Sequence, residues 1–326
     1  IRVTSYGIPH ILAEDWGDLG FGYGYQFTSD NFCELAKHVV RVNGEMSKYF
    51  GRSNQNLASD ALIKFFGKKS TIRVNGLLHA DKRMVEVSEG YAAGYNHYLD
   101  NIPQGMHQSC INAEWLRPID LYDVARMSVY ITLLASFSDP RIANAVLALG
   151  IEEDNEQSAL NLETFALSES MGSNSYALGS EVTQTGQAML LGNPHYPWRG
   201  QRRFYQVHMT IPEEINVMGI TILGSPLINV GFTEKFAWTH TVSNANRFTL
   251  YELDLNDQDR KTYIYNQKRT KIKSFPIEIE VKENNGSIST ETIELHFSRF
   301  GLLLDAGVLL GDESLTGWPN RDGKVF

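Results

Sequence analysis

The spacing of apolar residues changes near residue 150, and this change restricts the chain to folds that combine helices with antiparallel strands. Over residues 80–99, apolar side chains recur at three- and four-residue steps, which is typical of one face of a helix. Over residues 277–281 and 293–297 they alternate with charged residues, and Asn285-Gly286 lies between the two runs, so a β-hairpin is predicted there. Helices first and strands second predict an α+β fold.

Three regions follow from the same patterns. Residues 1–151 are predicted to be mainly helical, and one of their helices is expected to begin at Asp30 as its N-cap. Residues 152–172 contain many Glu, Asn, Gln and Ser residues and few large apolar ones, which is typical of an exposed linker. A solvated amphipathic helix is the alternative for this segment. Residues 173–326 are predicted to consist mainly of short strands.

Charge and composition exclude several classes of function. The chain of 326 residues has 29 Lys and Arg against 38 Asp and Glu, a net charge of −9, and it has no basic run, which argues against nucleic acid and anionic membranes as partners. The longest nearly uninterrupted apolar stretch, 129–137, is much shorter than the roughly 20 residues that span a bilayer, so no membrane span is expected. The first residue is Ile1 and no basic-then-apolar leader follows, so we expect either a removed signal peptide or a trimmed sequence.

Cofactor motifs are also absent from the sequence. Two cysteines, Cys33 and Cys110, are too few for a four-ligand zinc site, and they suit either one disulfide or two buried thiols. The glycines of 20–24 lack the G-x-G-x-x-G spacing of dinucleotide sites, and neither a Walker loop nor a G-x-S-x-G elbow occurs. We therefore expect no cofactor.

Several short strings, in this order and spacing, resemble one family. They are Tyr-Gly-Ile-Pro-His-Ile at 6–11, Met-Gly-Ser-Asn-Ser-Tyr-Ala-Leu-Gly at 171–179, Leu-Gly-Asn-Pro-His-Tyr-Pro-Trp at 191–198 and Ala-Trp-Thr-His-Thr-Val at 237–242. The chain resembles the penicillin acylase family of N-terminal-nucleophile hydrolases, and within it the acyl-homoserine lactone and aculeacin-type acylases more than the penicillin G enzymes. The resemblance implies an αββα sandwich of antiparallel sheets, with 1–151 as the helical α-chain region, 152–172 as a spacer peptide and 173–326 as the first part of a β-chain that is incomplete at its C-terminus.

The resemblance also implies a precursor that cuts itself between Gly172 and Ser173. A serine hydroxyl is a weak nucleophile without an adjacent base. Cleavage turns the Ser173 nitrogen into an α-amine with an ordinary pKa of about 7.7–8.0, which can accept the hydroxyl proton. Gly172 has no Cβ, so its own carbonyl, which precedes Ser173, is open to attack by the Ser173 hydroxyl. The implied activity is that of a linear-amide hydrolase that removes an acyl group through a Ser173 acyl-enzyme.

Other roles are carried over from the family pattern. The backbone N–H of Val242, on a strand 69 residues after the nucleophile, is expected to stabilise the oxyanion, with an Asn side chain beyond Phe326 in the remaining β-chain as the second donor. His195 is expected to position the α-amine or the scissile amide. A histidine that caps a strand end after Pro194 is the alternative.

The resemblance implies a periplasmic or secreted protein and therefore favours a Cys33–Cys110 disulfide. Candidate residues for an apolar acyl pocket are Phe137, Phe232, Trp238 and Val242, and all four equally suit a core. Some relatives bind calcium through carboxylates just after the oxyanion strand, but residues 243–248 contain none, so calcium is not expected. The expected partner is a small N-acylated molecule: an acyl-homoserine lactone, a lipopeptide or a β-lactam.

Two other hypotheses remain open. The chain is alternatively a non-catalytic or unprocessed precursor fragment that binds acyl ligands. It is alternatively a hydrolase in which an internal Ser173 acts with His195 and a carboxylate as a triad.

Overall fold

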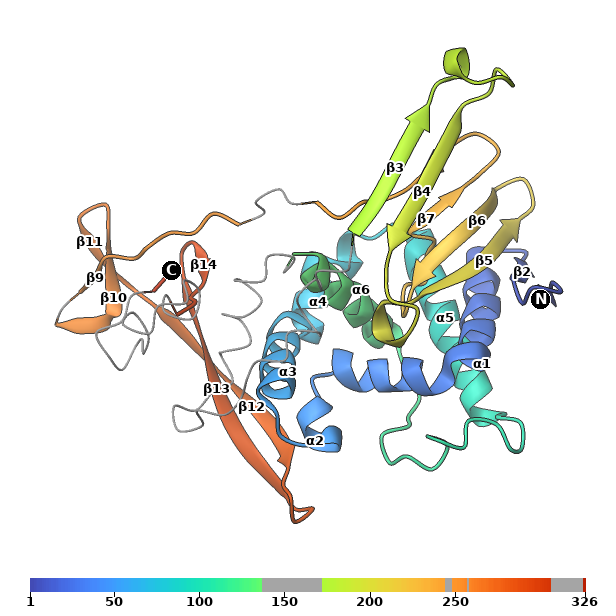
Figure 1. The fold of residues 1–326 in the computed structure, drawn as a ribbon. Coiled ribbons are helices and arrows are strands. Elements are labelled where there is room, and N and C mark those ends of the chain that lie inside the picture. The colour runs from blue at the N-terminus through green and yellow to red at the C-terminus, as the bar shows by residue number, and fades with distance from the viewer. Residues whose placement is uncertain (137–171, 244–247, 257, 306–324) are drawn as a thin grey trace. The chain divides into compact units, whose positions relative to one another are not determined.

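A computed structural model describes residues 1–136, 172–243, 248–256, 258–305 and 325–326. They form two compact units that interleave along the sequence (Figure 1). Of the described residues, unit 1 contains 1–42, 67–131 and 172–243, and unit 2 contains 43–66, 132–136, 248–256, 258–305 and 325–326. Both helices and strands are abundant in the described residues, which confirms the α+β fold class.

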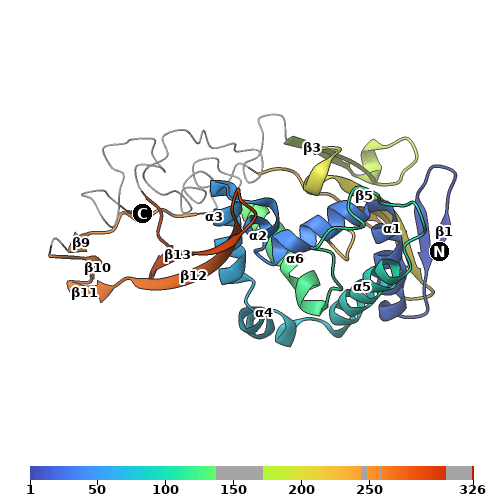
Figure 2. The same ribbon diagram turned by 90° about the horizontal axis from the view of Figure 1, so that it is seen from below.

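Two long helices of unit 1, α1 (Trp16–Val42) and α5 (Lys82–Asp100), lie side by side (Figure 2). Asp81 caps α5 by accepting a hydrogen bond from the backbone N–H of Arg83 at 2.9 Å. The predicted face of α5 is buried, with Val87, Tyr91 and Tyr95 in the core. The periodicity over 80–99 therefore predicted this helix correctly.

Glycines allow the backbones of α1 and α5 to approach closely. A Cβ on Gly24 would stand 2.2 Å from the carbonyl oxygen of Tyr91, and one on Gly90 would stand 2.0 Å from that of Gly17. Both distances are far below van der Waals contact, so only glycine fits. The glycine-rich run at 20–24 thus serves helix packing.

The helix predicted to begin at Asp30 is the second part of α1. Asn31 has non-helical dihedral angles (φ −134°, ψ 21°), so a kink there separates two helices within α1, and the second begins next to the predicted N-cap. The Asn31 side chain donates to the carbonyl of Phe27 at 3.1 Å and accepts from Arg203. Asp30 accepts a hydrogen bond from the Tyr205 hydroxyl at 2.5 Å. The irregular turn of α1 is therefore bonded to Arg203, just before the strand β5 (Phe204–Ile211), and to Tyr205 within that strand.

A six-stranded sheet in unit 1 has the order β1-β2-β5-β6-β7-β8. Its strands are β1 (Arg2–Val3), β2 (Pro9–Leu12), β5 (Phe204–Ile211), β6 (Ile215–Ile222), β7 (Val230–Phe232) and β8 (Ala237–Trp238). Val207, Met209 and Ile211 alternate into the core, as a strand with one buried face requires. The pair β2 and β5 is parallel, whereas the other neighbours are antiparallel. The two sequence regions thus share one sheet.

The remaining elements of unit 1 include α4 (Lys69–Asn75), most of α6 (Leu121–Ser136), and the strands β3 (Gly172–Leu178) and β4 (Met189–His195). The strands β3 and β4 form a separate antiparallel hairpin. Of the predicted linker 152–172, all but Gly172 lies outside the described residues, so the division of the chain into 1–151, 152–172 and 173–326 stays a prediction.

Unit 2 contains the predicted hairpin. Its strands β12 (Lys273–Lys282) and β13 (Ile288–Ser298) pair antiparallel, and Gly286 occupies the turn with a positive φ of 83°. Its core joins Leu57 and Ala61 of α3 (Asn54–Phe66) to Ile277, Ile279, Val281 and Leu295 of the hairpin. The other elements are α2 (Met46–Phe50), β9 (Leu255–Asn256), β10 (Asp259–Tyr265), β11 (Lys268–Lys271) and β14 (Gly301–Leu302).

Among the helices in the described ranges, none combines the length and apolar character needed to cross a membrane.

Candidate functional site

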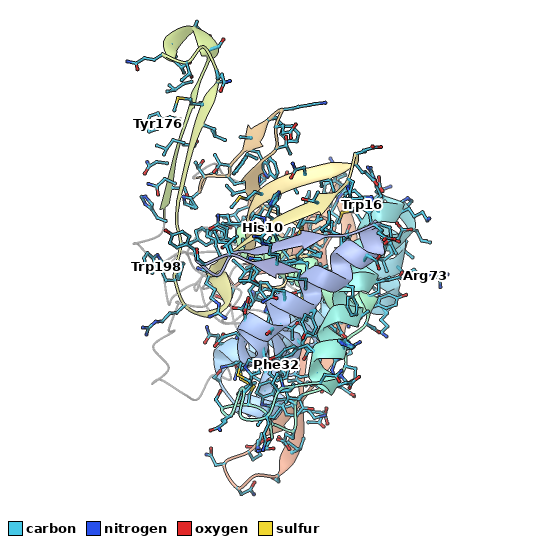
Figure 3. All side chains as sticks on the ribbon, turned by 90° about the vertical axis from the view of Figure 1, so that its right-hand side faces the viewer. His10, Trp16, Phe32, Arg73, Tyr176 and Trp198 are labelled. Carbon is cyan, nitrogen blue, oxygen red and sulfur yellow. A yellow bond between two sulfur atoms is a disulfide. The ribbon has the colours of Figure 1, made fainter. Side chains whose placement is uncertain are left out.

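The hairpin of β3 and β4 brings the predicted cleavage junction and the predicted histidine together. Gly172 is the first residue of β3 and pairs with His195, the last residue of β4, and Ser173 pairs with Pro194. Farther along, Tyr176 pairs with Leu191 (Figure 3). Since directly opposed residues in an antiparallel pair point to the same face, this register decides which side chains can meet.

Ser173 follows Gly172 on β3 and is half-buried. Its hydroxyl donates a hydrogen bond to the carbonyl oxygen of Gly172. The hydroxyl oxygen therefore lies beside the carbonyl group that autoproteolysis would require it to attack.

His195 lies on the other face of the hairpin from the Ser173 side chain, because it is paired with Gly172 and side chains alternate along a strand. A Cβ on Gly172 would stand 3.6 Å from Nδ1 of the imidazole, so the ring lies over this glycine. The other ring nitrogen, Nε2, is 3.1 Å from the amide nitrogen of Asn193. The imidazole thus faces Gly172 and contacts the Asn193 amide.

The segment 239–242, which ends at Val242, contacts the face of the hairpin that carries the Ser173 side chain. A Cβ on Gly192 would stand 2.9 Å from Oγ1 of Thr239, so Thr239 packs on this glycine. Gly192 pairs with Ser175, and both share the face of Ser173. Val242 follows three residues later and is half-buried, but β8 ends at Trp238, so Val242 is not on the predicted strand.

The predicted pocket residues are only partly brought together. Phe232 and Trp238 lie on the β7–β8 hairpin, where Phe232 is paired with Ala237. Phe232 is 53% exposed, whereas the half-buried Trp238 donates through its indole nitrogen to the Asn229 carbonyl at 2.8 Å. Phe232 is thus not a core residue in this structure. Phe137 lies outside the described residues.

Cys33 and Cys110 are joined in a disulfide whose Cα atoms are 5.7 Å apart. Both sulfurs lie in a core cluster with Phe32 and Tyr98, so the disulfide ties α1 to the segment after α5. In the part of the chain that the structure describes, no group of three or more His, Cys, Asp or Glu side chains is arranged to hold a metal ion. Four residues of the segment considered for calcium, 244–247, are outside that part.

Two contacts at the site were not predicted. The contact of Asn193 with His195 could have been predicted, because residues two apart on a strand share a face and Asn193 precedes His195 by two. The Thr239–Gly192 contact joins distant segments, and no local pattern indicates it.

Comparison with known proteins supports the resemblance. The penicillin amidase family model matches residues 1–322, and the chain belongs to this family. Its relatives include the acyl-homoserine lactone acylase PvdQ of Pseudomonas putida, 38% identical over 100% of this chain and 43% of that protein. The aculeacin-A acylase of Actinoplanes utahensis is 32% identical over 92% of this chain and 40% of that protein.

The chain therefore spans about two-fifths of the length of these curated relatives. Among solved structures, a thermostable penicillin G acylase from Alcaligenes faecalis matches with a TM-score of 0.35 and 19% identity, covering 48% of this chain and 92% of that one.

Proposed function

We propose that the protein is a hydrolase of linear amides that activates itself by cutting the Gly172–Ser173 bond. The observation that carries this proposal is the hydrogen bond from the Ser173 hydroxyl to the Gly172 carbonyl, at the junction where the family resemblance places the cut. Proximity of this kind contributes much of the rate in an intramolecular reaction.

The cut proceeds through an ester. The Ser173 oxygen attacks the Gly172 carbonyl carbon, the C–N bond breaks, and the hydroxyl proton ends on the Ser173 nitrogen. Water then hydrolyses the ester, which leaves a carboxylate on Gly172 and both a hydroxyl and an α-amine on Ser173. In the mature enzyme this amine takes the hydroxyl proton, Ser173 attacks the substrate amide, and the amine protonates the leaving nitrogen. A second water releases the acyl group as an acid.

The position of His195 favours the α-amine over the imidazole as the base. The imidazole lies on the other face of the hairpin from the Ser173 side chain, and its Nε2 contacts the Asn193 amide. A serine-histidine-carboxylate triad requires a bond from the histidine to the hydroxyl and a carboxylate on its second nitrogen. Among the described residues, neither contact occurs, so the triad hypothesis has less support.

The backbone N–H of Val242 is proposed as one oxyanion donor. The support is that Thr239, three residues earlier, packs against the Ser173 face of the hairpin. The second donor is proposed to be an Asn side chain in the remaining β-chain, which thereby becomes a partner of the described residues. Loss of one donor typically costs about 3–4 kcal/mol of transition-state stabilisation.

The proposed substrate is a small molecule with an aliphatic N-acyl chain. The support is that two relatives are named for an acyl-homoserine lactone and for aculeacin A, which points to quorum quenching or antibiotic deacylation as the setting. Phe232 offers an exposed aromatic surface for the acyl chain. The disulfide supports a periplasmic or secreted location for the enzyme and its zymogen.

Intact mass measurement tests the proposal. We expect the protein produced from its complete gene to yield a fragment that starts at Ser173, and Ser173→Ala to remain uncut. The matched control is Ser175→Ala, on the same strand and face, which should be cut normally. The purified wild type should release fatty acid from N-acyl-homoserine lactones. An uncut wild type that binds acyl ligands without hydrolysis would support the precursor-fragment hypothesis instead.

A further inference from the structure

Asn193 is a second polar side chain on the face of the hairpin that carries His195. It precedes His195 by two residues on β4 and pairs with Asn174 on β3. Its amide nitrogen lies 3.1 Å from Nε2 of His195, within hydrogen-bond distance. Both side chains are exposed. Among the described residues, the Asn193 amide is the hydrogen-bond partner of the His195 imidazole.

The chemistry of this contact determines where the imidazole proton lies. A side-chain amide nitrogen only donates hydrogen bonds. With the amide nitrogen turned toward the ring, Nε2 of His195 is the acceptor, and in a neutral imidazole the proton then lies on Nδ1. In a neutral imidazole an Asp at position 193 would have the opposite effect, because a carboxylate only accepts and would require the proton on Nε2 and not on Nδ1.

Nδ1 is the nitrogen on the side of the scissile peptide. It stands 3.6 Å from the point where a Cβ would sit on Gly172, the residue directly opposed to His195. An N–H beside this residue would stabilise the negative charge that develops on the Gly172 carbonyl oxygen under attack. A bare Nδ1 would instead repel that charge.

We propose that Asn193 is a positioning residue that holds His195 in the Nδ1–H tautomer, so that the imidazole acts at the Gly172–Ser173 junction as a hydrogen-bond donor and not as a base. No proton is transferred from the imidazole in this role. The donor role at the junction rests on the proposed function. The tautomer of His195 does not, because it is a property of the uncut protein.

The tautomer is measured first, independently of cleavage. Selective ¹⁵N-histidine labelling of the Ser173→Ala protein, with His195→Gln for assignment, reports which ring nitrogen carries the proton. We expect Nδ1–H when residue 193 is Asn and Nε2–H after Asn193→Asp. Asn174→Ala is the matched control, since Asn174 lies on the same face and should leave the tautomer unchanged. An Nε2–H tautomer in the Asn193 protein would overturn the proposal.

Cleavage at Gly172 is then followed by mass with Ser173 present. Asn193→Asp should slow it about 100-fold, the loss typical of a missing oxyanion donor. Asn193→Gln, which keeps an amide donor, should recover most of the rate. Wild-type cleavage by Asn193→Asp would overturn the donor role. If the wild type itself is not cut, the proposed function fails together with the donor role, whereas the measured tautomer still decides the role of Asn193.

Discussion

His38 is a buried residue of α1 whose ring lies against the Tyr130 ring at 5.2 Å. It is 1% exposed, and neither ring nitrogen has a hydrogen-bond partner among the described residues. Burial and, to a smaller extent, the nearby Arg41 charge together lower the pKa of His38 from 6.5 to about 3. The folded protein therefore holds this imidazole neutral over a pH range in which the unfolded chain protonates it.

The expected consequence is a loss of stability in acid. Between pH 6.5 and 3 the unfolded chain binds a proton at His38 that the folded protein does not, so the free energy of unfolding falls as the pH falls. The full effect is about 3–5 kcal/mol. We expect His38→Phe, which keeps a ring against Tyr130, to remove this part of the pH dependence in urea titrations at pH 7 and pH 4.

The difference between variant and wild type isolates His38 from other titrating groups. Burial raises the pKa of Asp60 to about 6, despite its hydrogen bonds from the Met46 and Ser47 backbone, and this shift acts in the opposite direction. The Asp60 contribution is the same in the wild type and in His38→Phe, so it cancels when the two pH dependences are subtracted. Equal pH slopes for wild type and His38→Phe would contradict the assignment.

At the scale of the elements, the α1–α5 contact depends on glycine. Gly24→Ala should destabilise unit 1 by about 1–3 kcal/mol or more, because the new Cβ would collide with the Tyr91 carbonyl oxygen and the two backbones would have to separate. Gly17→Ala, in the same helix, is the control. Its Cβ would meet only an Asp15 side-chain oxygen at 3.3 Å, so it should be neutral or stabilising by up to about 1 kcal/mol.

The irregular turn of α1 provides a second test. Tyr205→Phe keeps the ring contact with Phe27 at 4.8 Å and removes the hydroxyl that donates to Asp30. We expect a loss of about 1–2 kcal/mol in denaturant titrations, the range for a bond to a charged acceptor that water can partly replace. Tyr6→Phe should have no measurable effect, because Tyr6 is 91% exposed. Equal losses in both variants would rule out a specific role for the Asp30 bond.

These elements also show which parts of the fold could be predicted from the sequence. Helix α5 and the β12–β13 hairpin were predicted because their patterns lie within one short stretch. The close contact of α1 with α5 and the parallel pairing of β2 with β5 were not, because their partners are distant in the sequence.

The site divides in the same way. Ser173 and His195 were indicated by resemblance and not by any physical pattern. Their placement on opposite faces of the hairpin follows from a register that depends on how β3 and β4 pair. The contact of Thr239 with Gly192 depends on the approach of β8 to this hairpin, which the sequence alone does not reveal.

At the scale of the whole molecule, the β3–β4 hairpin carries an exposed apolar ladder. The pair Tyr176 and Leu191 is 63% and 53% exposed, and the pair Leu178 and Met189 is 44% and 56% exposed. The four side chains continue the face that carries His195. Contiguous apolar surface of this kind promotes association.

We therefore expect the chain of residues 1–326, produced by itself, to associate through this ladder. Tyr176→Thr combined with Leu191→Thr should shift it toward monomer in sedimentation velocity and lower its binding of an apolar dye, because threonine keeps the strand preference while removing apolar area. Tyr6→Thr removes an exposed aromatic residue between β1 and β2, at the other edge of the sheet from β8, and should leave both readouts unchanged. If the double variant associates like the wild type, the ladder is not the cause, and the association must come from another exposed surface such as that around Phe232 and Phe236.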